Sequence, residues 1–141
     1  MDALVEDAKP LVAEIARLYA GIVDGPRLTS AFRESLVWLP TAADDPAGSV
    51  LTADYRGVHW LYAFTGEAEL ARFAMKTGGA DRPRTYLTAR GWRVLDVLVP
   101  AMDQPAGVAV DAAGKRPMFL PPSVEAVKAA ESAASNRREG V

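Results

Sequence analysis

The stretch VHWLYAFTGEAELARF, from Val58 to Phe73, decides the fold, because a buried strand runs directly into a short amphipathic helix. Side chains alternate between the two faces of a strand, and within 58–64 both sets of alternating positions are largely apolar. Such a strand lies in the middle of a sheet and is covered on both sides, at least along its second half. Thr65 or Gly66 is expected to cap the helix that follows.

The rest of the chain alternates between helical and strand patterns. Apolar residues at helical spacing predict a main helix that begins at Pro10 and ends at Asp24-Gly25-Pro26. Tyr55-Arg56-Gly57 predicts the tight turn of a hairpin. Further strands are predicted at 35–40, 85–88, 107–111 and 117–120, and further helices at 27–33, 88–99 (capped by Thr88) and 123–134. This order predicts an α/β (α+β) fold, in which helices pack on a mixed, mostly antiparallel sheet of about five to six strands.

The length and composition are those of one small globular protein. A chain of 141 residues suits a single domain, predicted here over 1–134, with a flexible tail over 135–141. The chain has no cysteine, which excludes disulfides, thiolate catalysis, and zinc or iron–sulfur sites built on thiolates. The absence of cysteine also suits a reducing compartment.

Charge and hydropathy indicate a cytoplasmic protein. The first residues, MDALVEDAK, are acidic, whereas a signal peptide begins with basic residues. The most apolar runs, such as WRVLDVLVP, are far shorter than the roughly 18 to 20 residues of a membrane span. A formal net charge of −2 gives no general attraction to nucleic acid or anionic lipid. We therefore expect neither nucleic acid nor a membrane among the partners.

The candidates for chemistry are few. His59 is the only histidine, and neither a G-x-S-x-G elbow nor another recognisable triad accompanies it. It is therefore interpreted as a packing residue rather than a general acid or base. A metal site would need carboxylates at a recognised spacing, and Asp44-Asp45, followed by Pro46, does not resemble a calcium loop. The sequence predicts no catalytic residues, no metal and no cofactor.

Two segments remain as candidates for binding. The first is the segment TGGADRPR, in which Gly78 and Gly79 free backbone N–H groups while Arg82 and Arg84 bring charge, so it is a possible anion loop. It lacks a lysine after the glycines and a helix that opens from the loop, which favours a solvated loop instead.

The second candidate is a contact patch for a protein partner, made of Trp92, Arg90 and Arg93. Tryptophan and arginine dominate binding hot spots, and Trp92 lies at the edge of the buried stripe of its helix. Trp38 and Trp60, in contrast, are expected to be mainly core residues. The alanine-rich C-terminal helix is a further possible docking element.

An ordered set of landmarks extends over about 11–127. Its members are Val37-Trp38-Leu39-Pro40, Trp60-Leu61-Tyr62-Ala63-Phe64-Thr65, Glu69-Leu70 with Phe73, Gly91 with Val94-Leu95, Gly107-Val108-Ala109-Val110-Asp111, and Pro117-Met118 with Leu120-Pro121. With these landmarks the chain resembles the N-terminal domain of SseB, the enhanced-serine-sensitivity protein, as it appears in small actinobacterial proteins. Members often carry an Asn-Pro-Gly turn where this chain has Asp111-Ala112-Ala113-Gly114, and longer members carry a second, C-terminal domain.

The resemblance implies an α/β fold and no known enzymatic activity, with an association, by family context, to secretion loci and toxin-neutralising systems. It lends no catalytic residues. The first hypothesis is therefore a non-catalytic protein-interaction module, adaptor or immunity-like, whose protein partner the sequence does not identify. The alternative is a domain that binds a small anionic ligand at strand ends near Thr65 and the 78–84 loop. An enzyme is the third hypothesis.

Overall fold

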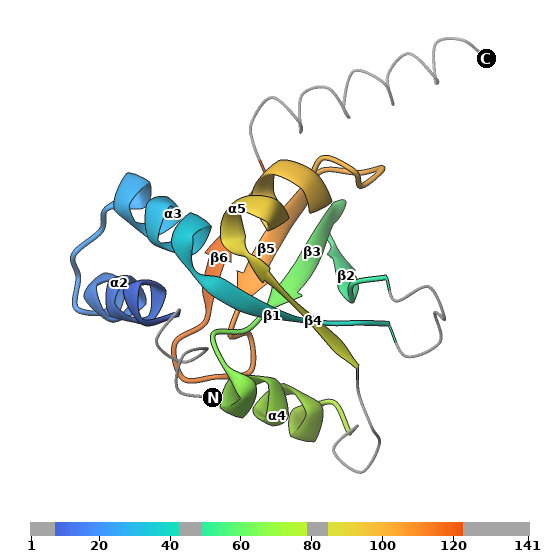
Figure 1. Cartoon of the computed structure of the whole chain (residues 1–141), viewed down its shortest axis with the longest axis horizontal. Helices are drawn as coiled ribbons and strands as arrows, with labels where there is room; N and C mark the ends of the chain where they lie inside the picture. The colour runs from blue at the N-terminus through green and yellow to red at the C-terminus, as the bar shows by residue number, and fades with distance from the viewer. Residues whose placement is uncertain (1–7, 43–48, 79–84, 123–141) are drawn as a thin grey trace, which may run out of the picture.

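The computed structural model describes residues 8–42, 49–78 and 85–122. The helices in these ranges are α2 (Lys9–Tyr19), α3 (Gly25–Glu34), α4 (Glu67–Lys76) and the short α5 (Gly91–Arg93), which continues as the π-helical turn η1 (Val94–Leu98). The strands are β1 (Leu36–Pro40), β2 (Thr52–Tyr55), β3 (Val58–Ala63), β4 (Tyr86–Arg90), β5 (Ala106–Val110) and β6 (Met118–Leu120). The predicted mixed α/β fold is confirmed (Figure 1).

The strands form two sheets rather than the one expected. The larger sheet has the order β2-β3-β5-β6; β3 and β5 run parallel, and its other neighbours are antiparallel. The smaller sheet pairs β1 with β4. Trp38 and Phe64 exchange two backbone hydrogen bonds of 2.9 Å, which join β1 to the end of β3. The larger sheet is mixed, and the strand pairs of the two sheets are mostly antiparallel, as predicted.

The predicted hairpin is confirmed, with β3 at the centre of the larger sheet. Arg56 and Gly57 connect β2 to β3 with φ angles of 52° and 81°. Positive φ at both central residues matches the right-handed twist of the two strands. On its other side β3 pairs with β5 in parallel, from His59 opposite Ala106 to Ala63 opposite Val110.

The two faces of the larger sheet are covered unequally. Helices α2 and α3 and the turn η1 cover one face, where Leu11, Phe32 and Val94 belong to the same buried cluster as Leu61 and Val108. Of the helices that the structure describes, only α4 packs on the other face, at the end of β3 (Figure 1). The ring of Phe73 there lies 4.8 Å from that of Tyr62 and 5.2 Å from that of Phe64. Covering of β3 along its second half is thus confirmed.

Two predicted helix boundaries are wrong. Helix α2 ends at Tyr19, and Asp24-Gly25-Pro26 begins α3 instead of ending α2. Proline is favourable in a first helical turn, where its missing N–H leaves no hydrogen bond unmade.

Thr88 lies within β4 and caps nothing, and the helix begins only at Gly91. The strand pairing extends to this point because the N–H of Gly91 donates to the carbonyl oxygen of Ser35 over 2.9 Å. The predicted helix at 123–134 and the tail at 135–141 lie outside the described residues.

Candidate binding sites

The face of the larger sheet beyond α4 is uncovered among the described residues. The strand register places Ala53, Trp60 and Gly107 in one row across this face, and Tyr62, Ala109 and Phe119 in the next. A groove of about 610 Å³ crosses these rows. We call this surface the open face and define it by six side chains of that groove: Ala53, Tyr55, Trp60, Tyr62, Ala109 and Phe119.

The aromatic rings of the open face are held in place by close packing. The ring of Trp60 meets that of Phe119 edge to face, with centroids 5.7 Å apart and planes at 80°. It also lies over Gly107, because a Cβ at that position would be 2.6 Å from Cζ3 of Trp60. Phe119 and Tyr55 remain 54% and 61% exposed. Trp60 is only half-buried, against the expectation of a core residue, since no described helix covers this part of the sheet.

A second site lies where the parallel strands β3 and β5 end. Parallel strands bring their carboxyl ends to the same edge of a sheet. Thr65 lies two residues after the end of β3, and Asp111 directly follows β5. The backbone N–H of Thr65 donates to Oδ1 of Asp111 over 2.9 Å, and its hydroxyl donates to Oδ2 over 2.8 Å. The hydroxyl of Thr65 is therefore engaged with Asp111, and the cap of α4 is Gly66.

The carboxyl group of Asp111 is shielded from solvent. Burial raises its pKa to about 6; the two hydrogen bonds from Thr65 act in the opposite direction, and the charge of Glu69 raises the pKa further. Asp111 has a φ of 51°, in the left-handed region that aspartate tolerates better than most residues. A strand end, a turn and a buried acid thus coincide at one residue.

A pocket of about 280 Å³ opens around this pair. We call it the strand-end pocket; it is lined by Val12, Ile15, Thr65, Glu69, Arg72, Asp111, Gly114, Lys115 and Arg116. Two of these side chains are acidic, three are basic and two are aliphatic. The sequence-based alternative placed a small-ligand pocket near Thr65 and the 78–84 loop. A cavity lies at Thr65, and the binding of a ligand stays a prediction.

The predicted anion loop is largely outside the described residues. Gly78 follows α4 with a φ of 76°, and Gly79, Arg82 and Arg84 belong to the range 79–84, which the structure does not describe. Gly78 does not line the strand-end pocket. An anion site at this loop stays a prediction.

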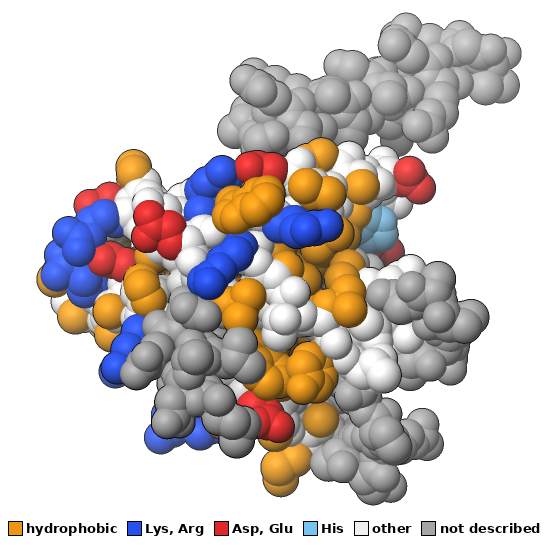
Figure 2. All heavy atoms as spheres, in the orientation of Figure 1, with side chains coloured by type: hydrophobic (Ala, Val, Ile, Leu, Met, Phe, Trp, Pro, Cys, Tyr) orange, Lys and Arg blue, Asp and Glu red, His pale blue; other side chains and the backbone are white. Residues whose placement is uncertain are grey.

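The predicted contact patch lies on the opposite side of the larger sheet from the open face. Trp92 on α5 is 45% exposed, and its neighbours Arg90 and Arg93 are exposed too. Arg90 donates from Nη1 to the carbonyl oxygen of Glu34 over 3.0 Å, so this side chain also ties β4 to the end of α3. Basic and apolar side chains gather over α5 in Figure 2. A binding role for this patch remains a prediction.

His59 lies away from both sites. It is directly opposite Asp54 in the β2–β3 pair, and its Nδ1 contacts the Asp54 carboxylate. This pair belongs to the sheet face opposite the open face, and His59 lines neither the groove nor the strand-end pocket. Its surroundings fit a packing residue with one acidic neighbour.

Metal and membrane sites receive no support from the part of the chain that is described. No group of three histidine, cysteine or acidic residues lies within these ranges in a position to hold a metal ion. None of the helices described is long and apolar enough to cross a membrane.

Comparison with known proteins gives no match: no protein-family model, no curated protein and no solved structure is similar enough to count as a relative. The resemblance to the SseB N-terminal domain therefore stays a prediction from the sequence. Function has to be inferred from the surfaces themselves.

Proposed function

We propose that this chain is a non-catalytic protein-interaction module, adaptor or immunity-like, and that the open face is its docking surface. One observation carries the proposal: a contiguous, uncharged set of aromatic and small side chains crosses four strands without a covering helix among the described residues. Exposed apolar patches of this kind mark binding surfaces in soluble proteins. Aromatic anchors such as Trp60 and Phe119 also dominate the energetics of protein interfaces.

The occupant that fits best is an amphipathic helix of another protein. A sheet face is buried against a layer of helices or a second sheet, and on this face α4 supplies only one end of such a layer. A partner helix beside α4 would continue that layer, in the way that an amphipathic helix enters a hydrophobic groove.

Charge supports the same choice. Among the described residues that line the groove, only Asp54 is acidic or basic. Its side chain belongs to the face of His59, because paired residues share a face and Ala53 and Tyr55 point the other way. A partner segment with an apolar stripe would leave no buried charge unpaired here.

The test compares charge insertions at exposed apolar positions. Phe119→Lys and Tyr55→Lys place a charge on the open face at side chains that are already 54% and 61% exposed. Val23→Lys, at a position that is 79% exposed away from the groove, is the matched control. A partner captured from the native host is purified, and its affinity for each variant is measured by calorimetry. We expect affinity to fall at least about tenfold, or about 1.4 kcal/mol, for the open-face variants and to be unchanged for the control.

A partner that binds Phe119→Lys and Tyr55→Lys as tightly as the wild type contradicts the proposal. If Trp92→Ala abolishes binding instead, the docking surface is the patch predicted from the sequence. Because these two surfaces lie on opposite sides of the larger sheet, the variants separate them.

Two further outcomes identify other occupants and also contradict a partner helix. If sedimentation shows a wild-type dimer that Phe119→Lys converts to a monomer, a second copy of the chain covers the open face. If removal of 123–141 newly exposes the face to a hydrophobic dye, this segment of the same chain covers it.

A further inference from the structure

One buried oxygen of a residue that lines the strand-end pocket has no hydrogen-bond donor among the described residues. Oε2 of Glu69 is shielded from solvent and receives no hydrogen bond from the described residues. The other oxygen, Oε1, lies 3.9 Å from Nη1 of Arg72, which is an ion pair at long range. A buried polar atom without a partner is uncommon in proteins and points to a water, an ion or a ligand at that place.

Gly114 gives this carboxylate its space. A Cβ at Gly114 would overlap Oε2 of Glu69, so any larger residue there would displace the carboxylate. The N–H of Gly114 donates to the carbonyl oxygen of Asp111 over 2.9 Å, which holds the turn beneath the pocket in place. The fold thus keeps an acidic oxygen against a turn that provides it with no donor.

The two acidic side chains of the pocket, Glu69 and Asp111, require a ligand group that donates several hydrogen bonds. A carboxylate has about four lone-pair positions, and Thr65 uses two of those on Asp111. Further positions remain on the carboxylates of Asp111 and Glu69. A primary ammonium group offers three N–H donors and a compensating positive charge, so it suits both acids at once.

The basic side chains of the pocket require a negatively charged group on the same ligand. Arg72 on α4 and Lys115 and Arg116 on the β5–β6 connection bring three cations to the same pocket. A plain anion such as phosphate would be attracted by them but would also face Glu69 and Asp111. A ligand with one ammonium and one carboxylate satisfies both sets of charges.

The aliphatic wall of the pocket favours a ligand that also carries an apolar side chain. Val12 and Ile15 on α2 line the pocket with aliphatic side chains. The volume of about 280 Å³ lies just below the roughly 300 to 1,000 Å³ of pockets for drug-sized ligands. The cavity therefore has room for a metabolite with a short apolar side chain.

We infer that the strand-end pocket binds a small aliphatic α-amino acid. Its ammonium group faces the carboxylates of Glu69 and Asp111, its carboxylate faces the three basic side chains, and its side chain packs on α2. The location agrees with the general tendency of α/β sheets to bind ligands outside the carboxyl ends of parallel strands. The strand-end pocket shares no lining residue with the open face, so this inference does not depend on the proposed docking function.

The test is calorimetric titration of the whole chain with L-alanine, L-valine and L-leucine as probes, each at up to about 10 mM, a range that detects millimolar dissociation constants. Propionate lacks the ammonium group, isobutylamine lacks the carboxylate, and inorganic phosphate tests a simple anion site. We expect at least one amino acid to bind at least tenfold more tightly than all three of these controls.

The variants test the position of the ligand. Glu69→Gln keeps the shape of the side chain and removes its charge, and we expect it to lower affinity at least tenfold. Glu67→Gln is the matched control, because Glu67 is exposed in the same first turn of α4 and does not line the pocket. Lys115→Ala, at an exposed residue of the connection after β5, is expected to weaken binding several-fold without affecting the thermal midpoint.

Three results overturn the inference: no amino acid binds, phosphate binds more tightly than every amino acid, or Glu69→Gln and Lys115→Ala both bind as the wild type does. Phe119→Lys should leave this binding unchanged, so a failure here is distinct from a failure of the docking proposal.

Discussion

Thr65 donates two hydrogen bonds to the carboxylate of Asp111, one from its backbone N–H over 2.9 Å and one from its hydroxyl over 2.8 Å. These bonds connect the carboxyl end of β3 with that of β5. Asp111 is only 8% exposed, so the connection places an ionisable group where water reaches it poorly. The same pair therefore fixes the parallel strands and makes stability sensitive to pH.

The first prediction concerns this pH dependence. Burial raises the pKa of Asp111 to about 6 in the folded protein, whereas an aspartate in the unfolded chain has a pKa of about 3.8. Between these values the folded state binds more protons than the unfolded state, so the free energy of unfolding falls as pH rises. The contribution of Asp111 is fully present below about pH 4 and is lost above about pH 6, and its size is at most about 3 kcal/mol.

Asp111→Asn should remove this contribution, because an amide does not ionise. Asparagine tolerates the positive φ and still offers an acceptor to the N–H of Thr65. Urea unfolding at pH 4 and pH 7.5 is the measurement. We expect the wild type to lose more stability than the variant over this interval, and equal losses would show that Asp111 ionises with an ordinary pKa.

The second prediction concerns Gly91, at the start of α5. A Cβ at Gly91 would overlap the carbonyl oxygen of Phe32, which belongs to the backbone of α3 and has no room to move away. We expect Gly91→Ala to lower the free energy of unfolding by about 3 kcal/mol, the upper range for overpacking. Gly25→Ala is the control, because no atom lies within 4 Å of the added Cβ and alanine favours helix. Similar stability of both variants in urea would contradict the close approach of α3 and α5.

The strands and the hairpin could be predicted because their signals are local. Alternation within 58–64 gives the strand, and Arg56-Gly57 gives a turn with two positive φ angles. The covering of the sheet could not be predicted in the same way. Apolar residues on both faces of β3 suggested a strand that is largely covered, and the pattern does not say how far along the strand a helix extends. The open face is the part that no described helix reaches.

The strand-end pocket is a second feature that could not be predicted from local sequence patterns. Thr65 and Asp111 are each a polar residue directly after an apolar strand, a signal that was present in the sequence. They are 46 positions apart, and they meet only because β3 and β5 run parallel and in register. Strand order is a property of the assembled sheet, which local patterning does not encode. The helix that starts at Gly91 instead of Thr88 is a further example, since pairing with Ser35 extends the strand.

The third prediction concerns the turn between β2 and β3. Gly57 has a φ of 81°, which an L-residue with a Cβ adopts only at a cost, although no atom lies within 4 Å of an added Cβ. We expect Gly57→Ala to lower the free energy of unfolding by about 1 to 2 kcal/mol and Gly57→Asn by less, because asparagine visits this conformation more readily. Gly66→Ala, with extended backbone and equally open space, should cost less than Gly57→Ala. Thermal unfolding of the three variants provides the comparison, and a larger loss for Gly66→Ala would argue against strain at the turn.

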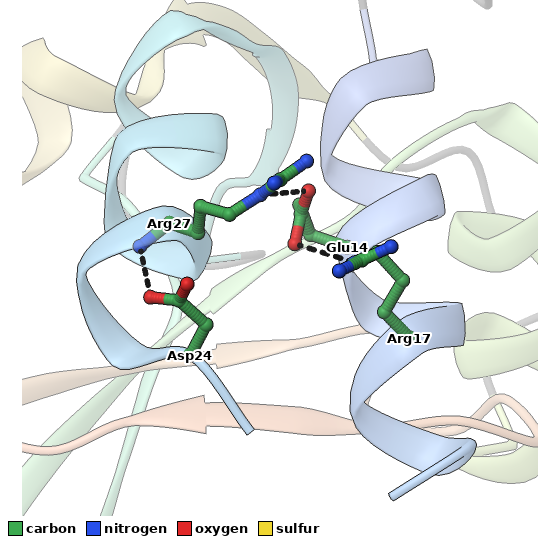
Figure 3. Close-up of polar contacts among 4 residues, drawn as sticks. All are labelled: Glu14, Arg17, Asp24 and Arg27. Atoms are coloured by element: carbon green, nitrogen blue, oxygen red, sulfur yellow. Dashed lines mark hydrogen bonds and ion pairs between the residues drawn. The ribbon is translucent and has the colours of Figure 1, made fainter. Parts of the chain in front are cut away.

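The fourth prediction concerns the start of α3, where the side chain of Asp24 accepts a hydrogen bond of 3.1 Å from the backbone N–H of Arg27 (Figure 3). The Nε of Arg27 also donates to Glu14 on α2 over 2.9 Å, so the cap helps to hold Arg27 beside the neighbouring helix. We expect Asp24→Ala to lower the free energy of unfolding by about 1 kcal/mol, the usual cost of losing a cap. Asp24→Asn, which retains a capping oxygen without the charge, should recover most of this loss.

High salt distinguishes the capping hydrogen bond of Asp24 from the ion pair between Arg27 and Glu14. The ion pair of Arg27 with Glu14 involves a guanidinium side chain that is 59% exposed, so it is screened and contributes little at about 1 M salt. The capping hydrogen bond is short-range and should persist. The loss in Asp24→Ala is therefore expected to be similar in urea titrations at low and high salt. If that loss disappeared at high salt, Asp24 would act through its charge and not as the cap of α3.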